Sequence, residues 1–176
     1  MLLLALYLLP IQCQDLPHNS GECYSATLEG RMSKFAEKNI EVMLEIFQAI
    51  ERRDQQRMFD LVHPEAEFLW PPTLPYAAAR NPKPSGPGWG TTWIPLQPDE
   101  ADRRLEPRVV AASDEEVVIH WRQKGVGREG DRIDTPVLGL YRLRDGKLAL
   151  AQMFYFDAAA VVAFLNRVTN ALTRNS

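Results

Sequence analysis

The chain has 176 residues, of which 45% are hydrophobic, and its 20 basic and 23 acidic residues give a formal net charge of -3 at pH 7. This length and apolar content suit one well-buried core and are short for two, so we expect a single domain. The chain has no basic run of the kind that neutralises a phosphate backbone, which excludes nucleic acid as an expected partner.

Residues 1–31 form a leader that differs in composition from the rest of the chain. Its apolar run, residues 1–10, is too short to cross a bilayer, so we expect no stable membrane span. The run is similar to the core of a signal peptide, although no basic residue precedes it and no small-residue cleavage pattern follows. Alternatively, residues 1–31 are an upstream extension and translation starts at Met32. The protein is expected to be secreted if the leader is a working signal peptide, and cytoplasmic if translation starts at Met32.

The domain, residues 32–176, is predicted to begin with two helices. Apolar residues recur every three or four positions over residues 34–53, which predicts an amphipathic helix that Ser33 can cap. A shorter helix is predicted over residues 55–62, because Asp54 can cap it and Pro64 disfavours helical geometry in the residue before it.

A strand over residues 65–70 and a long covering loop over residues 71–98 are predicted next. The loop is rich in proline and glycine, yet it carries Tyr76, Trp89 and Trp93. A disordered linker seldom contains so many large aromatic residues. We therefore expect this loop to pack over the sheet.

The last third of the chain predicts a meander of strands followed by a helix. The expected strands are residues 109–112, 116–123, 132–144 and 148–156, and the helix is residues 158–172. Asp145 and Gly146 accept the positive φ angles of a tight hairpin turn, so the last two strands must pair.

This order of elements resembles the SnoaL-like and ketosteroid-isomerase-like families of the nuclear transport factor 2-like superfamily. The resemblance covers about residues 32–168, and its best local match is the hairpin at residues 141–157. It implies an α+β fold, in which a cone-shaped, curved antiparallel sheet wraps around a long N-terminal helix as a cystatin-like roll, with a C-terminal helix. It also implies an apolar pocket inside the cone and a homodimer formed through the outer face of the sheet.

The catalytic residues of the isomerase do not carry over to this chain. By alignment, the position of the isomerase base is Trp70, that of its protonated aspartate is Gly139 and that of its helical tyrosine is Ile46. Ketosteroid isomerase is the known example of a carboxylic acid held neutral in an apolar site. The resemblance thus implies that this chain is not a ketosteroid isomerase.

Two other residues are candidates for catalytic acid–base chemistry. Asp134 lies in a largely apolar strand, where burial would raise the pKa of its carboxyl group and suit it to act as a base. Strand alternation instead points Asp134 away from the pocket, toward a pair with Arg122 or Arg132, unless a bulge at Pro136 reverses the phase. His120 is a candidate because histidine can serve as an acid or a base. The strand phase of the family, however, places it outward, at a surface or dimer interface.

We expect no metal and no cofactor. The three histidines are scattered and the domain has no cysteine, so no metal-ligand spacing is present. Residues 125–130 match the G-x-G-x-x-G pattern of dinucleotide-binding loops, but strand-like sequence follows instead of a helix, which favours a hairpin connection.

Aromatic and methionine side chains of inward phase, together with those of the covering loop, predict a cavity for a small apolar organic ligand. The expected substrate-binding residues are Trp70, Tyr76, Trp93, Trp121, Tyr141, Met153 and Tyr155. Two functions fit such a cavity: a cofactor-independent acid–base isomerase, cyclase or hydrolase, and a non-catalytic ligand-binding or dimerisation module. A carboxylate or histidine inside the cavity would favour the enzyme, whereas apolar side chains and hydroxyl groups alone would favour the module.

Overall fold

A five-stranded sheet with strand order β1-β5-β4-β3-β2 organises the computed structural model, which describes residues 32–80 and 88–173. Strands β2 to β5 pair antiparallel in chain order, and β1 pairs with β5 in parallel. The strands are β1 (Val62–Leu69), β2 (Arg108–Ala112), β3 (Glu116–Val126), β4 (Arg132–Arg144) and β5 (Lys147–Tyr155). This α+β arrangement, with helices at both chain ends of the sheet, is the predicted fold class.

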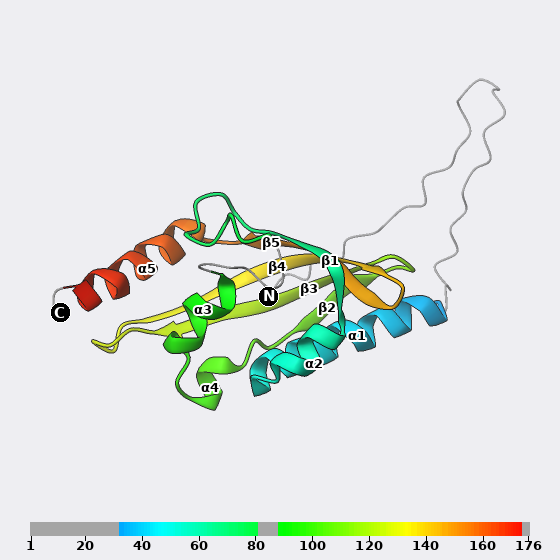
Figure 1. The fold of residues 1–176 in the computed structure, drawn as a ribbon, viewed down its shortest axis with the longest axis horizontal. Coiled ribbons are helices and arrows are strands. Elements are labelled where there is room, and N and C mark those ends of the chain that lie inside the picture. The colour runs from blue at the N-terminus through cyan, green and yellow to red at the C-terminus, as the bar shows by residue number, and fades with distance from the viewer. Residues whose placement is uncertain (1–31, 81–87, 174–176) are drawn as a thin grey trace, which may run out of the picture. The chain divides into compact units, whose positions relative to one another are not determined.

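Helices lie before, between and after the strands. Helix α1 packs against β2 and β3, and the last helix continues from the end of β5 (Figure 1). The helices are α1 (Lys34–Arg52), α2 (Gln55–Asp60), α3 (Trp89–Trp93), the 3-10 helix η1 (Ile94–Leu96), α4 (Glu100–Arg103) and α5 (Ala158–Thr173).

Both predicted helix caps are confirmed. The Ser33 hydroxyl accepts a hydrogen bond from the Ala36 backbone N–H at 3.1 Å, and an Asp54 carboxylate oxygen accepts one from the Arg57 N–H at 3.0 Å. Each cap satisfies a backbone donor that has no partner within its own helix. The first helix therefore begins where its sequence predicts.

The predicted boundary between the second helix and the first strand was wrong. Helix α2 ends at Asp60, and β1 already begins at Val62, which the sequence placed in the helix. The reason is pairing with a distant segment: Val62 lies opposite Leu148, and the Leu148 N–H donates to the Leu61 carbonyl at 2.9 Å. Pairing with β5 outweighs the local helical preference of these residues.

The hairpin between β4 and β5 is confirmed. Asp145 and Gly146 have φ angles of 54° and 70°, in the left-handed region that the predicted turn requires. The register from β3 to β4 runs without a shift from Glu116 opposite Arg142 to Val126 opposite Arg132. Alternation along both strands is therefore unbroken, and side chains of one phase all reach the same face.

The predicted covering segment contributes to the core. Tyr76 and Trp93 are buried with the inward side chains of β3, β4 and β5, and Trp93 stacks on Phe164 of α5 with ring centroids 6.1 Å apart. The segment contains α3 and η1, which the sequence had assigned to a loop. Residues 81–87 of this segment lie outside the described residues.

The described residues all belong to one compact unit, Met32–Ser176. The leader of residues 1–31, with Cys13 and Cys23, lies outside the part of the chain that the structure describes. Within the described part, no helix is both long enough and apolar enough to cross a membrane.

Candidate functional site

A recess of about 350 Å³ lies where β1 ends beside β5 and α5 begins; we refer to it as the β1–β5 recess. Pro71 and Pro72 end β1, because proline has no N–H with which to continue a strand ladder. Strand β1 therefore pairs with β5 only as far as Leu69 opposite Gln152, and β5 continues beyond it to Tyr155. The recess is lined by Leu69, Trp70, Pro71, Pro72, Gln152, Met153, Phe154, Tyr155 and Ala158.

A chain of neutral hydrogen bonds begins at the inner wall of this recess. The Tyr155 hydroxyl lies 3.2 Å from the Tyr76 hydroxyl, which accepts a hydrogen bond from the Trp93 indole N–H at 3.0 Å. The Trp70 ring packs edge-on against Tyr76 with centroids 5.1 Å apart. This series of hydrogen bonds connects the recess to the side chains that cover the inner face of the sheet.

The predicted substrate-binding residues lie at three depths. Trp70, Met153 and Tyr155 line the recess. Tyr76 and Trp93 lie behind it in the hydrogen-bonded chain. Trp121 and Tyr141 lie deeper, each packed edge-on against Phe47 of α1 with ring centroids 5.9 Å apart.

A further hydrogen bond at the inner face involves Gln123, which the sequence analysis did not identify as a candidate. The Trp89 indole N–H donates to the Gln123 side-chain oxygen at 2.7 Å, and Gln123 is fully buried. Gln123 follows Val117, Ile119 and Trp121 in the inward phase of β3, so strand alternation could have found it.

The phenols of the inner face are uncharged at neutral pH. Burial raises the pKa of Tyr76 to about 12, although hydrogen bonds from Tyr155 and Trp93 partly oppose the shift. Burial also raises the pKa of Tyr141 and that of Tyr155. These three side chains can therefore donate hydrogen bonds, but they cannot act as bases near pH 7.

The two acid–base candidates lie on the opposite, outer face. Because the β3–β4 register has no bulge at Pro136, Asp134 keeps the outward phase and is exposed. Arg122 donates to its carboxylate at 2.6 Å, and this hydrogen bond raises the pKa of Arg122. His120 is half-buried on the same face, opposite Leu138 and Arg108. The structure thus brings neither residue to the predicted aromatic lining.

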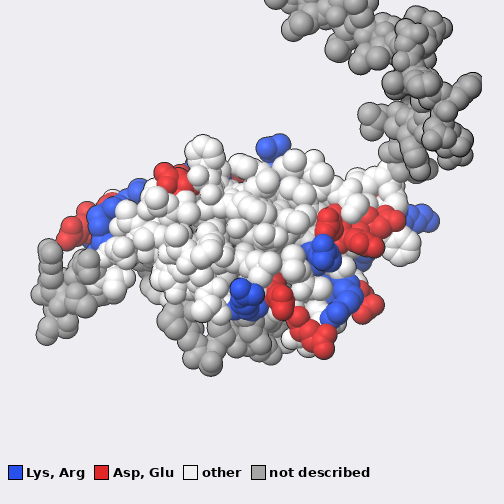
Figure 2. Space-filling view, turned by 90° about the horizontal axis from the view of Figure 1, so that it is seen from above, with Lys and Arg blue, Asp and Glu red and all other residues white. Residues whose placement is uncertain are grey.

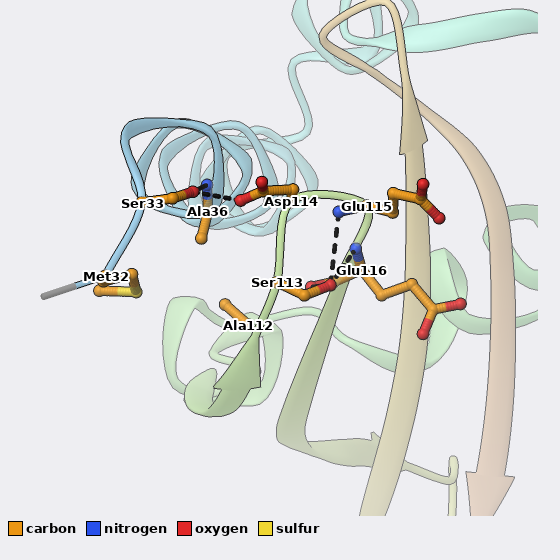
Figure 3. Close-up of a pocket in the computed structure, with 8 residues that line it drawn as sticks. All are labelled: Met32, Ser33, Ala36, Ala112, Ser113, Asp114, Glu115 and Glu116. Atoms are coloured by element: carbon orange, nitrogen blue, oxygen red, sulfur yellow. Dashed lines mark hydrogen bonds between the residues drawn. The ribbon is translucent and has the colours of Figure 1, made fainter. Parts of the chain in front are cut away.

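A second recess, of about 500 Å³, lies between the start of α1 and the turn from β2 to β3. Figure 3 shows the Ser33 and Asp114 side chains pointing toward each other there, and their oxygens are hydrogen-bonded. The Ser113 hydroxyl accepts from the backbone N–H groups of Glu115 and Glu116. These polar groups are engaged in the helix cap and the turn, so we regard this recess as structural.

Residues 32–80 and 88–173 contain no cluster of three or more His, Cys, Asp or Glu side chains that could hold a metal ion.

Comparisons with solved structures show the same fold at low sequence identity. A protein of Xanthomonas campestris with a cystatin-like fold is 21% identical with a TM-score of 0.59, over 72% of this chain and 97% of that one. TerC, co-crystallized with polyporic acid, is 18% identical with a TM-score of 0.55, over 73% of this chain and 98% of that one. A protein of Jannaschia sp. CCS1 assigned as a SnoaL-like polyketide cyclase is 19% identical with a TM-score of 0.54, over 76% and 96%.

No curated protein matches the sequence. The family comparison is more specific, since the SnoaL-like domain matches residues 43–151, from the middle of α1 to the middle of β5. This range is more than half of the chain and includes most of the sheet that carries the inner-face aromatics. The chain therefore belongs to the SnoaL-like domain family.

Proposed function

We propose that this protein binds a small, flat, uncharged organic molecule in the β1–β5 recess, as a ligand-binding module. The observation that carries the proposal is the chemistry of the recess and of the side chains behind it. Its lining is aromatic, apolar or amide and includes the neutral phenol of Tyr155. Behind it lie the phenol of Tyr76 and the indole of Trp93, which are also neutral. A bound molecule would meet hydrogen-bond donors and aromatic faces, but no charged partner.

Size and surroundings support a small neutral ligand. A volume of about 350 Å³ falls within the range of small-molecule sites. In the view from above, a broad area in the middle of the surface carries no charged side chain, and the charged side chains lie around it (Figure 2). An ionised ligand would lose hydration in such a site without gaining an opposite charge.

Catalysis is the second candidate, and one observation favours it. Protonated phenols and indole N–H groups gathered at one face can stabilise negative charge that develops on a carbonyl oxygen. None of the recess-lining residues is a carboxylate or a histidine. Any proton abstraction there would therefore have to use water or a group of the substrate as the base. For this reason we rank binding first.

Binding is tested with 9-fluorenone, a flat neutral ketone, by isothermal titration calorimetry. Trp70→Ala removes an aromatic wall of the recess and is expected to weaken binding about tenfold, or about 1.4 kcal/mol. Phe35→Ala truncates an exposed aromatic residue of α1, and Asp134→Asn neutralises the outer-face carboxylate. Neither of these two variants should change the affinity. An equal loss in Trp70→Ala and Phe35→Ala would contradict binding in the recess.

Fluorene, which has the ring system of fluorenone without the carbonyl group, provides a second uncharged probe. Native mass spectrometry of protein purified gently from its source cells would also reveal any compound that co-purifies. If neither probe binds and no compound is retained, the proposed binding function is wrong.

We further infer that two copies associate through the outer face of the sheet. Leu138 and Phe154 lie opposite each other on β4 and β5 and are 41% and 49% exposed. This adjacent pair of exposed apolar side chains is the observation that supports association through the outer face. The ion pair of Arg122 with Asp134 borders them and offers both signs of charge, so a two-fold related copy can place cation opposite anion.

The expected oligomer is a dimer in native mass spectrometry, and Leu138→Glu should convert it to a monomer by burying an unpaired charge in the interface. Phe35→Glu places the same charge on α1 and should leave the dimer intact. A monomeric wild-type protein would overturn this inference. Because Phe154 also lines the β1–β5 recess, ligand affinity should be measured on both variants.

A further inference from the structure

The edge of β5 that faces β1 is open inside the β1–β5 recess. The two strands pair in parallel only as far as Leu69 opposite Gln152, whereas β5 runs on to Tyr155. Met153 and Tyr155 both line the recess. One side of the recess is therefore strand backbone, whose N–H and C=O groups are strong hydrogen-bonding groups.

The pairing of β5 with β4 shows which backbone groups face this open edge. The Phe156 N–H donates to the carbonyl of Pro136 on β4 at 3.1 Å. Along an antiparallel pair, residues that bond to the partner strand alternate with residues that do not. Phe154 and Phe156 therefore direct their backbone groups toward β4, and Met153 and Tyr155 direct theirs toward the recess.

Proline ends the ladder at the next position of β1. In the parallel register, the residue that would donate to the Met153 carbonyl is Pro71, which has no N–H. The Pro71 carbonyl, which would accept from the Tyr155 N–H, accepts from the Leu74 N–H at 3.0 Å as the chain enters a turn. Strand β1 thus offers no partner to the Met153 carbonyl or to the Tyr155 N–H.

These two backbone groups form an acceptor and a donor with the spacing of a sheet ladder. In a parallel sheet, the C=O of one residue and the N–H of the residue two positions later bond to the N–H and C=O of a single residue on the neighbouring strand. A cyclic secondary amide, or lactam, also carries its N–H and C=O side by side in one plane. A lactam can therefore take the place of that strand residue.

We propose that the β1–β5 recess binds a flat, neutral lactam, whose N–H donates to the Met153 carbonyl and whose C=O accepts from the Tyr155 N–H. This inference rests on the proposed binding function and specifies its ligand class. A lactam satisfies both backbone groups, whereas a ketone satisfies the donor and leaves the desolvated Met153 carbonyl without a partner. The rings of the ligand would contact the aromatic side chains of the lining, Trp70 and Phe154.

A matched pair of probes tests the lactam contact. 2-Quinolone is a flat bicyclic lactam, and coumarin has the same shape and carbonyl group but an oxygen atom in place of the N–H. The wild-type protein is expected to bind 2-quinolone about tenfold more tightly than coumarin in isothermal titration calorimetry, because coumarin leaves the Met153 carbonyl unpaired. Trp70→Ala should weaken the binding of both probes by the same factor, since their rings meet the same aromatic wall.

Amide hydrogen exchange locates the contact in the wild-type protein. Without ligand, the Tyr155 N–H should exchange faster than the Phe154 N–H, which faces β4. Saturation with 2-quinolone should slow exchange at Tyr155 about tenfold relative to Phe154. The Phe154 amide is the internal control, because it lies one residue away on the paired edge of the same strand.

Failure of the lactam contact can be distinguished from failure of the recess. Equal affinity for 2-quinolone and coumarin, or an unchanged exchange rate at Tyr155 under saturating 2-quinolone, would overturn the lactam site. Binding of 9-fluorenone that Trp70→Ala weakens would then still support the recess as a site for flat molecules. If 2-quinolone, coumarin and 9-fluorenone all fail to bind, the binding function and the lactam site are both overturned.

Discussion

Trp93→Ala is expected to lower the free energy of unfolding by about 3–5 kcal/mol, the range for truncating a fully buried large aromatic residue. Trp93 is 0% exposed, stacks on Phe164 of α5 and donates its indole N–H to Tyr76. Its loss would leave a cavity between β3 and α5 and remove a donor from the hydrogen-bonded chain. Urea denaturation followed by circular dichroism measures the change.

The strand beneath Trp93 provides the control. A Cβ atom at Gly125 would lie 2.8 Å from the Trp93 ring and 3.2 Å from the Phe164 ring, so Gly125→Ala should destabilise the fold by about 1–3 kcal/mol through overpacking. Gly90→Ala adds the same methyl group to α3, where the nearest atom, on Ile94, is 3.8 Å away. That variant should be neutral or slightly stabilising, because alanine favours a helix over glycine. Similar effects of the two variants would contradict close packing of Trp93 on β3.

The sheet could be predicted from the sequence because its signals are local. Alternation along residues 116–123 assigned Val117, Ile119 and Trp121 to the inner face, and all three are buried there. Asp145 and Gly146 specify the turn by their own backbone preferences. Long strands with one buried face leave little freedom of register, since a slip of one residue would expose the whole apolar set.

Features that depend on distant segments could not be predicted in the same way. The first residues of β1 are strand because they pair with β5, which no local pattern around Val62 reports. The depth of each predicted aromatic residue is likewise set by how α3 and the turns near Tyr76 pack over the sheet. The contact of Tyr141 with Gly139 is a further case, because its geometry depends on which way the tyrosine side chain turns along its own strand.

In the candidate site, too, local patterns could be predicted and contacts between distant segments could not. Inward phase and aromatic composition identified three of the nine residues that line the β1–β5 recess, together with four aromatic residues buried behind it. Gln123 could have been added by continuing the alternation. Composition alone does not show that the Trp93 indole N–H donates to the Tyr76 hydroxyl. That contact depends on side-chain directions on different elements.

Stability is expected to fall steeply above pH 10, because Tyr76, Tyr141 and Tyr155 all have a raised pKa in the folded state. In the unfolded chain, tyrosine titrates near its ordinary pKa of about 10. Below that pH both states keep their phenol protons, and the full stability is present. Between about pH 10 and the folded pKa values, the unfolded chain releases protons that the folded chain retains, so the free energy of unfolding decreases as the pH rises.

Each phenol contributes a slope of about 1.4 kcal/mol per pH unit in that window, and the three together about 4 kcal/mol per pH unit. Urea denaturation at intervals from pH 8 to about pH 11 measures the slope. Tyr141→Phe removes one titrating group and keeps its ring over Gly139, so its slope should be lower by about 1.4 kcal/mol per pH unit. An unchanged slope in Tyr141→Phe would mean that this phenol ionises in the folded protein as readily as in the unfolded chain. Its hydroxyl would then be solvated in the folded protein, which would contradict its burial on the inner face.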